Sequence, residues 1–551
     1  MLFSSFRSEC ESIAGAHASL LERPPSEVAA DLALPCFSLA KTMKKTPHGV
    51  AAELAAQWKV RGAIKEIRAE GPYVNFYVDW AKLSAAVVSE AMKEGYGKGS
   101  ERKKIIVEFS GPNTNKPLHV GHLRNDSIGM AISGILEFAG NEVLRSNIIN
   151  DRGVHICKSM LAYRKWGEGK TPQSENKKPD HFVGDFYVLF EKKSKEDPAL
   201  KEEIQTMLVA WERGDPDVRA LWKKMNSWTL SGIKQTYGDF GSRFDLWPME
   251  SEFYDKAKPV LDEGVKKKLF VENEKGDLVA KLEPLPDKVV LRADGTSIYI
   301  TNDIALTKHR FENYKIDGCI WVVATEQNLH FQQLFKIFEK LGYAWAKDCY
   351  HLGYGLVNLP SGRMKTREGT VVDADDLIGE LKKLAAGEIN KRENVSDAEL
   401  DARSRAIALA AIKYFMLRVE PQKDILFDPA KAISFEGDTG PYLQYTHARA
   451  SSVLRKAVKK AKAGALAAQE LPIVKKLAEF PEAAAKAAKE LKPNVVTTYL
   501  AELAALFNSY YHENNVIGSE NEESRLALVG AVKGVLGAGM KLLNIEPIER
   551  M

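Results

Sequence analysis

Cysteine is scarce and dispersed in this chain of 551 residues. Its five cysteines are an odd number and none lies in a C-x-x-C pair, which excludes a disulfide framework and a cysteine-based zinc site. Long uncharged apolar runs are also missing. The two most apolar stretches, 404–419 and 526–543, each contain a lysine and favour buried helices over membrane spans. The charged first residues do not form a signal peptide, so we expect a cytoplasmic protein without membrane contact.

A strong excess of charge of either sign is absent as well. The 78 Lys and Arg residues nearly balance the 74 Asp and Glu residues, which gives a net charge of +4. Any basic surface must therefore come from where the charges lie. The composition, with 45% hydrophobic and 28% charged residues, excludes a collagen, a coiled coil and a mainly disordered chain. At about 150 residues per domain the length predicts three or four domains.

Changes in residue pattern divide the chain into three units. Residues 1–98 predict a small α+β domain, and residues 99–394 predict a larger domain in which strands alternate with helices. A more polar segment at about 167–290 interrupts this alternation and predicts a largely helical insertion. Residues 395–551 are rich in Ala, Leu and Lys at helical spacing and predict an all-helical domain.

The middle unit carries the strongest fold signal. Its continuous apolar runs are typical of buried parallel strands, and helical segments lie between them. This alternation predicts an α/β fold with a Rossmann-like, doubly wound parallel sheet, whose carboxyl edge binds ligands. We expect strands at 104–109, 142–150, 319–324 and 349–358, with helices at 121–139, 152–166 and 328–341. In the C-terminal unit we expect helices at 402–418, 442–463, 473–492, 494–513 and 523–543.

A loop rich in Gly, Pro and Asn lies between the first of these strands and the helix that follows. It ends in an H-x-G-H motif at 119–122, whose histidines share one helix face. A helix N-terminus offers free N–H groups to phosphate. The imidazoles and a lysine can neutralise the charge of the phosphate, and the glycine leaves room for adenine or ribose. The alternative is an ordinary helix start with two surface histidines. The candidate ATP-site residues are Pro112, Asn113, Lys116, His119, Gly121 and His122.

A second cation-rich segment, 361–370, follows the last predicted strand. It concentrates three cations around Met364 within a loop, and such a loop can close over a triphosphate. The alternative is a solvated, charged turn. Arg363, Met364 and Lys365 are therefore further candidates for ATP binding and charge stabilisation.

The two motifs resemble the signatures of class I aminoacyl-tRNA synthetases, and more narrowly those of the arginyl-tRNA synthetase family. The resemblance covers nearly the whole chain and rests on segments 107–122, 294–303, 437–449 and 547–551. The second motif departs from the family, where it is K-M-S-K-S or K-M-S-T-R-K-G; here it is R-M-K-T-R-E-G. In members with a degenerate loop, a lysine just before H-x-G-H takes over the missing charge, and Lys116 has that position.

The resemblance implies an arginine–tRNA ligase with ATP, L-arginine and tRNA-Arg as its partners. In such an enzyme arginine and ATP form arginyl-adenylate and pyrophosphate, and the arginyl group then passes to the 3′ end of the tRNA with release of AMP. We expect a monomer in which Mg²⁺ assists the phosphates but no dedicated protein motif holds the metal. Charge stabilisation is assigned to Lys116, His119, His122, Arg363 and Lys365.

The resemblance also assigns an arginine pocket. Carboxylates accept the paired, planar donors of a guanidinium and discriminate against lysine, which lacks that fork. Tyr299 and Asp303 are four apart and can face one cavity from a helix; a core aromatic and a helix N-terminal charge are the alternatives. Gln327 is expected at a strand end, and His330 lies either near the adenine or in a structural role. The assigned residues are Glu108, Ser110, Asn113, Tyr299, Asp303 and Gln327.

For tRNA, the resemblance implies an N-terminal domain that binds the elbow and a helical domain that binds the anticodon. Between 449 and 462 lie six cations and no acid, which on a helix would form a positive side suited to phosphates, or simply a solvated face. Tyr510 could stack on an unpaired base or belong to the core. The candidate tRNA-binding residues are Asn75, Phe76, Arg449, Arg455, Lys456, Tyr510 and Met551.

Two other functions stay open at this point. A small-molecule nucleotidyltransferase also uses H-x-G-H, but it needs no basic helical domain. A non-catalytic tRNA-binding paralogue is suggested by the altered second motif. Pyrophosphate exchange with ATP and arginine, with and without tRNA, distinguishes all three.

Overall fold

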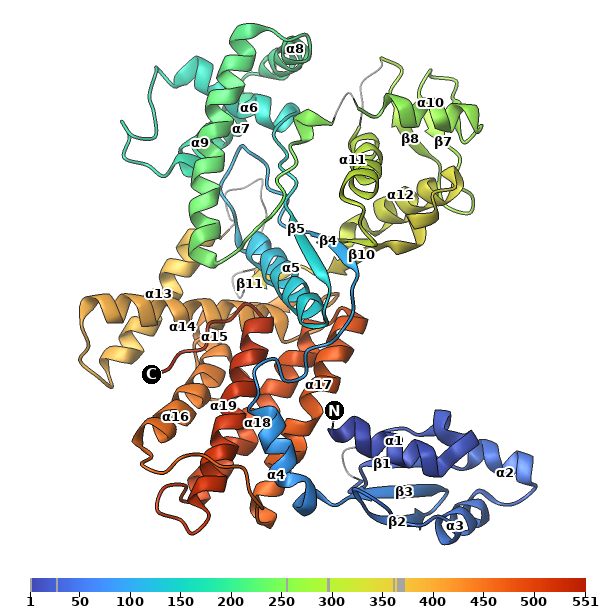
Figure 1. The fold of residues 1–551 in the computed structure, drawn as a ribbon. Coiled ribbons are helices and arrows are strands. Elements are labelled where there is room, and N and C mark those ends of the chain that lie inside the picture. The colour runs from blue at the N-terminus through green and yellow to red at the C-terminus, as the bar shows by residue number, and fades with distance from the viewer. Residues whose placement is uncertain (1, 26–27, 254–255, 295–297, 360–361, 364–371) are drawn as a thin grey trace.

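The structure, a computed structural model, describes residues 2–25, 28–253, 256–294, 298–359, 362–363 and 372–551. Figure 1 shows a small N-terminal lobe, a central α/β part with its insertion, and a C-terminal bundle of helices. The expected α/β class with a parallel sheet, the one predicted to be catalytic, is confirmed. In the described part of the chain, no helix is both long and apolar enough to cross a membrane.

The catalytic sheet has four parallel strands in the order β10-β9-β4-β5. Their bounds are β4 (Lys104–Glu108), β5 (Glu142–Ser146), β9 (Gly318–Ala324) and β10 (Cys349–Tyr354). Strand β4 pairs on one side with β5, which follows it in the chain, and on the other side with β9, which comes much later. The strand order therefore reverses at β4, and such a switch point creates a crevice at the carboxyl ends of the strands.

Alternate side chains of β4 enter opposite layers, as the pleat of a strand requires. Ile105 and Val107 belong to the core that contains α5 (Val120–Phe138). Ile106 belongs to the opposite core, with α11 (Tyr299–Tyr314) and α12 (Asn328–Leu341). Helix α5 is almost wholly buried because the C-terminal helices cover its far side. Its N-terminus, where the H-x-G-H motif lies, follows the carboxyl end of β4.

The insertion between β5 and β9 is mainly helical and lies at the top of Figure 1. Phe182, Phe190 and Trp211 are almost fully buried in its own core. It also contains a small antiparallel sheet, β6-β7-β8, which the sequence pattern did not predict because each strand has only three or four residues. The bounds are α6 (Val154–Trp166), α7 (Pro179–Glu196), α8 (Leu200–Glu212), α9 (Pro216–Phe240), α10 (Lys258–Lys266), β6 (Phe270–Glu272), β7 (Leu278–Ala280) and β8 (Lys288–Leu291).

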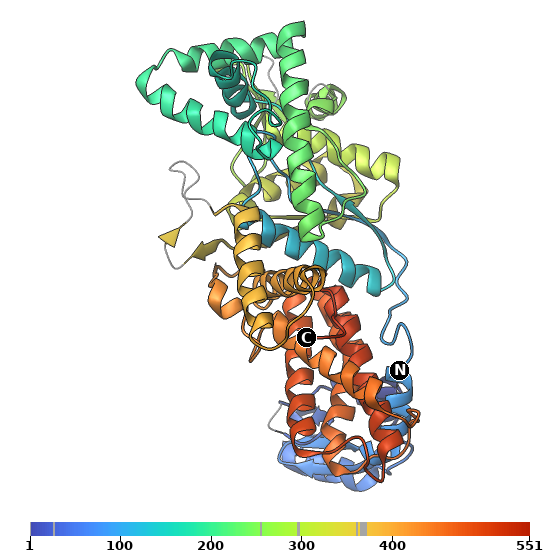
Figure 2. The same ribbon diagram turned by 90° about the vertical axis from the view of Figure 1, so that its left-hand side faces the viewer.

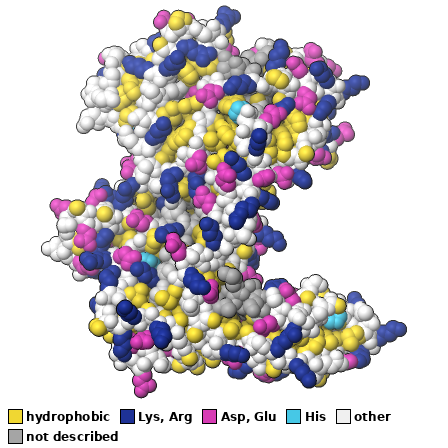
Figure 3. Space-filling view, viewed as in Figure 1, with side chains coloured by type: hydrophobic (Ala, Val, Ile, Leu, Met, Phe, Trp, Pro, Cys, Tyr) yellow, Lys and Arg dark blue, Asp and Glu magenta, His cyan; other side chains and the backbone are white. Residues whose placement is uncertain are grey.

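The N-terminal lobe has a separate core on an antiparallel sheet in the order β1-β3-β2. Helix α4 (Trp80–Ala91) lies within residues 1–98 but buries Val87 in the core of the C-terminal helices. Lys475 Nζ of the bundle also pairs with Asp31 of the lobe at 2.8 Å. Figure 3 shows the molecule hollowed between this lobe and the central part above it. The remaining bounds are α1 (Leu2–Ala14), β1 (Leu32–Pro35), α2 (Phe37–Met43), α3 (Pro47–Gln57), β2 (Ile64–Glu70) and β3 (Tyr73–Val78).

The C-terminal helices form a bundle below α5 (Figure 2). One prediction was wrong: the helix expected at 442–463 ends at Lys456, and residues 457–467 are not helical. Ala and Lys favour a helix, but Val458 is 96% exposed, so no apolar face is buried there to stabilise one. The bounds are β11 (Val357–Leu359), β12 (Gly362–Arg363), α13 (Ala374–Asn390), α14 (Asp397–Leu417), β13 (Ile425–Leu426), α15 (Pro429–Ala432), α16 (Gly440–Lys456), α17 (Leu471–Glu490), α18 (Pro493–Glu513) and α19 (Glu522–Leu542).

One buried cation fixes α5 to the segments around β11 and β13. Arg124 is fully buried. Its guanidinium donates to the carbonyl oxygens of Gly355 and Leu356 at 2.8 and 2.9 Å. It also donates to those of Pro421 and Lys423 at 3.1 and 2.5 Å. This side chain therefore holds the helix that carries the H-x-G-H motif in place.

We predict that Arg124→Leu lowers the free energy of unfolding by about 3 kcal/mol, because it removes the guanidinium that donates to the carbonyls of Gly355 and Lys423. The Leu356 and Pro421 carbonyls keep backbone donors. Urea denaturation followed by circular dichroism measures the change. The control is Arg102→Leu, at an exposed arginine that donates to the carbonyl of its neighbour Glu101. The control should change the free energy by less than about 0.5 kcal/mol. Equal stabilities of the two variants would contradict the role of Arg124.

Candidate active site

Strand β4 ends in a strained turn that begins the site. Ser110 and Gly111 have φ angles of 75° and 61°, and a non-glycine residue such as Ser110 keeps such an angle only where its surroundings hold it. The Ser110 N–H donates to Asn125 at 2.7 Å, and the Gly111 N–H donates to Asn147 at 3.0 Å. The Ser110 hydroxyl contacts the Tyr237 hydroxyl at 2.6 Å. Ser110 is therefore fixed at the carboxyl end of β4.

The loop after this turn is held against the chain that leaves β5. The Asn150 N–H donates to the Pro112 carbonyl at 3.0 Å, and the Thr114 N–H donates to the Asn150 carbonyl at 3.1 Å. Asn113 lies between these bonds and is half-buried. The structure thus brings Pro112 and Asn113 next to Ser110, at the switch point of the sheet.

The H-x-G-H segment forms the N-terminus of α5, as predicted. His119 is the N-cap: its Nδ1 accepts from the Gly121 N–H at 3.1 Å, and its own N–H donates to His122 Nδ1 at 3.1 Å. The two ring centres are 4.0 Å apart. A Cβ on Gly121 would lie 2.9 Å from the His119 ring. The glycine, expected to make room for a nucleotide, is thus already required by the packing of the motif itself.

Both imidazoles of the motif are neutral. Burial, together with the Lys116 charge, lowers the pKa of His119 to about 3. Burial and the neighbouring His119 hold the pKa of His122 well below its ordinary value. Since Nδ1 of each ring accepts a hydrogen bond, each ring carries its proton on Nε2. The pair therefore offers two uncharged N–H donors and leaves the positive charge to Lys116.

Lys116 is a desolvated cation beside these donors. Burial lowers the pKa of its ammonium. Within the described ranges no carboxylate forms an ion pair with it, and an ammonium of this kind suits a phosphate. Of the second motif, the backbone of Arg363 ends β12 and pairs with Asn358. The Arg363 side chain, Met364 and Lys365 lie outside the described residues.

The predicted arginine pocket differs from expectation at Glu108. This residue ends β4 as expected, but it is buried and its carboxylate pairs with the guanidinium of Arg310 on α11. Arg310 also donates to the Ser146 hydroxyl at 3.1 Å. Burial raises the pKa of Glu108, and the Arg310 charge opposes the rise. The Glu108 carboxylate is thus occupied by Arg310 and is not a free acceptor. The residue pattern of the strand could not predict this pairing.

Of the two carboxylates predicted for the arginine pocket, Asp303 is more accessible than Glu108. It lies one turn after Tyr299 on α11, and Tyr299 is 66% exposed, which excludes the core-aromatic alternative. His330 on α12 lies with Nε2 2.8 Å from the Asp303 carboxylate, so its contact is with the pocket acid. Gln327 does not end a strand: β9 stops at Ala324, and Gln327 is exposed in the 3-10 turn before α12.

One acid beside this pocket was missed from the sequence. Glu250 is buried, and burial raises its pKa to about 7, with Arg152 opposing the rise and Asp303 adding to it. The Asn302 amide donates to it at 3.3 Å. Glu250 lies in a short 3-10 turn outside every motif, so no sequence signal pointed to it.

Three residues that the sequence suggested for tRNA contact are buried. Phe76 is fully buried and stacks on a tryptophan of the N-terminal core. Asn75 is 3% exposed and its amide donates to Glu70 at 2.7 Å. Tyr510 is 5% exposed and its hydroxyl donates to Glu470 at 3.1 Å. These predictions of direct RNA contact are therefore wrong for the described structure, because each side chain is already enclosed by its own domain.

The other tRNA candidates lie on or near α16. Arg449 is half-buried and its guanidinium lies over a tyrosine ring at 4.4 Å. Arg455 and Lys456 are exposed at the end of the helix, and Arg455 donates to the Glu549 carbonyl at 3.0 Å. The lysines that follow lie on the non-helical segment, so the cations form an extended basic stretch instead of one helix face. Met551 packs beside the core that contains α14.

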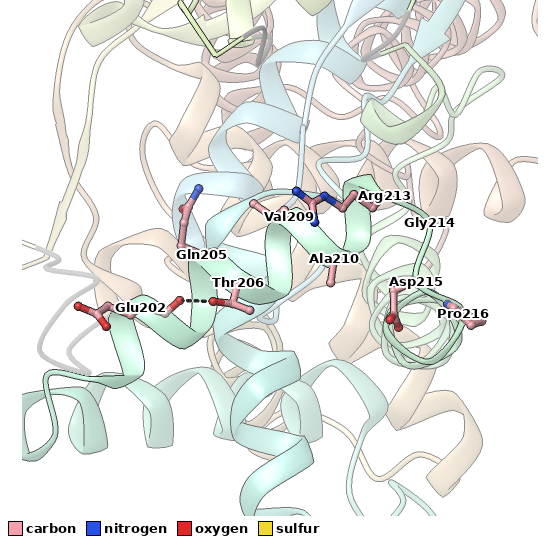
Figure 4. A pocket seen from close by; sticks show the side chains of 9 residues that line it. All are labelled: Glu202, Gln205, Thr206, Val209, Ala210, Arg213, Gly214, Asp215 and Pro216. Atoms are coloured by element: carbon pink, nitrogen blue, oxygen red, sulfur yellow. Dashed lines mark hydrogen bonds between the residues drawn. The ribbon is translucent and has the colours of Figure 1, made fainter.

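A hollow of about 810 Å³ lies away from these residues, at α8 and the turn into α9. Figure 4 shows its lining, where the Thr206 hydroxyl donates to the Glu202 carbonyl of the same helix at 3.1 Å. Neither a histidine nor a cysteine is among the residues that line it. The candidate active site is therefore the carboxyl edge of the catalytic sheet.

Three family models match consecutive parts of the chain. The model described as "tRNA synthetases class I (R), catalytic domain" matches residues 82–428. The "Arginyl tRNA synthetase N terminal domain" matches residues 3–78, and the "DALR anticodon binding domain" matches residues 443–551. The catalytic model alone covers more than half of the chain.

Relatives and solved structures agree with these matches. The arginine–tRNA ligase of Treponema denticola is 45% identical, over 96% of this chain and 94% of its own length. The arginine–tRNA ligase of Bacteroides fragilis is 39% identical, over 96% of this chain and 95% of its own length. The arginyl-tRNA synthetase structure from Thermus thermophilus superposes with a TM-score of 0.86 at 29% identity, over 99% of this chain and 100% of that one. The resemblance seen in the sequence is thereby confirmed, and the chain belongs to the arginyl-tRNA synthetase family of class I tRNA synthetases.

Proposed function

We propose that this protein is an arginine–tRNA ligase, which activates L-arginine with ATP and transfers it to tRNA-Arg. The observation that carries the proposal is the composition of one sheet edge. Neutral His119 and Lys116, which forms no ion pair within the described residues, lie at its phosphate-binding helix, and the Asp303 carboxylate belongs to the neighbouring pocket. His119 and Lys116 suit the phosphates of a nucleotide, and the Asp303 carboxylate suits a guanidinium. Relatives that are 39–45% identical are named arginine–tRNA ligase.

The proposed reaction has two steps. First, an arginine carboxylate oxygen forms a bond to the α-phosphorus of ATP, and the bond from that phosphorus to the bridging oxygen breaks and releases pyrophosphate. Second, a hydroxyl of the terminal tRNA ribose forms an ester with the arginyl carbon, its proton is released, and AMP leaves. No side chain needs to act as a nucleophile, so catalysis consists of positioning and electrostatic stabilisation.

On the nucleotide side, His119 and His122 donate to phosphate oxygens from Nε2, and Lys116 supplies charge. Burial lowers the pKa of Lys116, because the charged ammonium is poorly solvated there. An anion placed beside the ammonium therefore stabilises its charged form. The second motif adds further cations. The proposed lining of the ATP site also includes Pro112, Asn113, Gly121, Arg363, Met364 and Lys365.

On the amino-acid side, Asp303 accepts the substrate guanidinium, with Tyr299 next to it on α11. Ser110 and Asn113 bind the α-amino and carboxylate groups. Glu108 acts indirectly by holding Arg310 behind the pocket. Gln327 is exposed at the start of α12 and belongs to the rim of the pocket.

The domain roles belong to the same proposal. Residues 1–98 bind the tRNA elbow, 99–394 hold the catalytic site, and 395–551 bind the anticodon. The exposed Arg455 and Lys456 support this, since they begin a basic stretch suited to RNA phosphates. Arg449 and Met551 are the further contacts proposed there. We propose a cytoplasmic location, because the five cysteines are buried and form no disulfide, which suits a reducing compartment. A monomer is part of the same proposal.

Magnesium belongs to the proposal as an ion carried by the ATP phosphates. Among the described residues, the group of side chains with metal-ligand spacing is Asp180, His181 and Asp375. The Lys178 ammonium already lies 2.5 Å from Asp375 and 3.2 Å from Asp180. These carboxylates therefore do not fit a protein-held Mg²⁺, which usually keeps waters and binds substrate phosphates.

Pyrophosphate exchange and aminoacylation test the proposed function. We expect exchange of labelled pyrophosphate into ATP only with arginine and tRNA present, and esterification of arginine to tRNA-Arg but not of lysine. Exchange without arginine would instead support a small-molecule nucleotidyltransferase. Folded protein that binds tRNA but gives no exchange would support a non-catalytic paralogue, which the altered second motif suggests.

We predict that His119→Asn lowers kcat/KM for exchange by about 10²- to 10³-fold. Asparagine still caps α5, so the fold stays intact while the imidazole donor is lost. Steady-state exchange kinetics measure the effect. His48→Asn, at an exposed histidine of α3, is the control and should keep the activity of the unmodified protein. Near-normal activity of His119→Asn would rule out the phosphate role.

We predict that Asp303→Asn raises KM for arginine by about 10- to 100-fold and leaves KM for ATP nearly unchanged. The variant loses a charged acceptor for the guanidinium but keeps the size of the side chain. Glu312→Gln changes charge on an exposed part of the same helix and serves as the control. An unchanged KM for arginine in Asp303→Asn would refute the pocket.

A further inference from the structure

A cluster of polar and charged side chains joins the insertion to the first turn of α13. The Asp375 carboxylate accepts hydrogen bonds from Lys178 Nζ at 2.5 Å and from Thr236 Oγ1 at 2.9 Å, and it lies 3.1 Å from His181 Nε2. Lys178 and His181 lie at the start of α7, and Thr236 lies on α9. Two helices of the insertion therefore hold one carboxylate of α13.

The same turn of α13 is paired with the H-x-G-H segment on its other side. Two backbone hydrogen bonds, of 3.1 and 3.0 Å, run between residues 118–120 and 372–374 and place Asp373 opposite His119. The Asp373 side chain caps α13 by accepting from the Asp375 N–H at 2.8 Å. A displacement of Asp375 therefore displaces the residues that pair with His119.

A hollow of about 230 Å³ lies among these elements. Its walls include Lys116 and His119 from the phosphate-binding segment, His181 from α7 and Asp373 from α13. The cluster thus borders the space next to the residues that are candidates for binding phosphate. His181 lines that space directly, whereas Asp375 is not among the lining residues and acts on the space through the backbone pairing.

The charges that face His181 favour its protonated form. Burial disfavours this form, but the hydrogen bond to Asp375 raises the pKa of His181, and the charges of Asp373 and Asp180 add to the rise. Three acids, Asp180, Asp373 and Asp375, therefore face His181, and the Lys178 ammonium pairs with two of them, Asp180 and Asp375. A protonated His181 supplies the second positive charge. Across the hollow, the H-x-G-H segment adds the Lys116 cation and the neutral ring of His119.

We propose that Lys178, His181 and Asp375 form a positioning link that transmits the placement of the insertion to the residues paired with His119, and thereby sets the affinity of the site for ATP. The inference rests on the proposed function, because ATP binding at the H-x-G-H segment is its readout. It adds three positioning residues, none of which belongs to either sequence motif.

Asp375→Asn tests the link, with Asp376→Asn as the matched control. Both remove one negative charge from the first turn of α13, but Asp376 is exposed and lies outside the cluster. We expect Asp375→Asn to raise KM for ATP in arginine-dependent exchange with tRNA present by about tenfold, equivalent to about 1.4 kcal/mol. KM for arginine of Asp375→Asn should stay within about twofold of its value in the unmodified protein. Both KM values of Asp376→Asn, for ATP and for arginine, should also stay within about twofold.

His181→Gln gives a second test through the pH profile. Glutamine reaches about the place of Nε2 and still donates, but it carries no charge. Because the pKa of His181 is raised, its charged contact is complete below about pH 6.5 and is lost as the pH rises through the raised pKa. We expect KM for ATP of the unmodified protein to rise as the pH increases above about 6.5 and passes through the raised pKa of His181. In His181→Gln it should be high throughout and nearly flat.

The outcomes separate the link from the proposed function. Unmodified protein without arginine-dependent exchange refutes the function. If the protein is active, the link is overturned by equal KM values for ATP in Asp375→Asn and Asp376→Asn, or by equal rises in KM for ATP and arginine. Should Asp375→Asn fail to fold, Thr236→Val removes a neutral hydroxyl that donates to Asp375 and accepts from Lys178. A rise of about two- to threefold in KM for ATP supports the link, and no rise overturns it.

Discussion

Helix α5 is packed so closely on both sides that the rest of the site depends on its position. Toward the sheet, a Cβ on Gly129 would lie 2.1 Å from the Phe109 ring. Toward the bundle, a Cβ on Gly134 would lie 2.9 Å from the Leu542 carbonyl oxygen. Glycine at both positions lets one helix contact the strand end and the C-terminal helices together. The H-x-G-H segment therefore stays at the carboxyl end of β4.

Burial then decides which groups around this helix carry charge. The pKa of His119 falls to about 3, so the ring donates a hydrogen bond without repelling Lys116. On the amino-acid side, Arg310 neutralises the buried Glu108, and Asp303 is left as the more accessible acid. One sheet edge thus holds a cation suited to phosphate and an anion suited to a guanidinium. In the proposed function, these opposite charges bind separate substrates.

Local pattern predicted the elements well where the segment is packed against other parts of the protein. The helix expected at 121–139 is found as α5, one residue earlier at each end, because its turns are packed on all sides. The same reasoning failed at 457–463, where helix-favouring residues have nothing to pack against. It also failed at Phe76 and Tyr510, since an aromatic residue has the same sequence signal whether it faces a core or a solvent-exposed surface.

By itself, the sequence determined the fold class, the family and the place of the H-x-G-H motif at a helix N-terminus, because these depend on short-range spacing and on residue types. Only the tertiary structure decided which side chains are free to act. It paired Glu108 with Arg310, brought Glu250 beside the pocket, and joined His181 to Asp375 across 194 positions. Such pairings depend on how distant elements pack and on how much water they exclude, and neither is encoded in the spacing of residues along one segment.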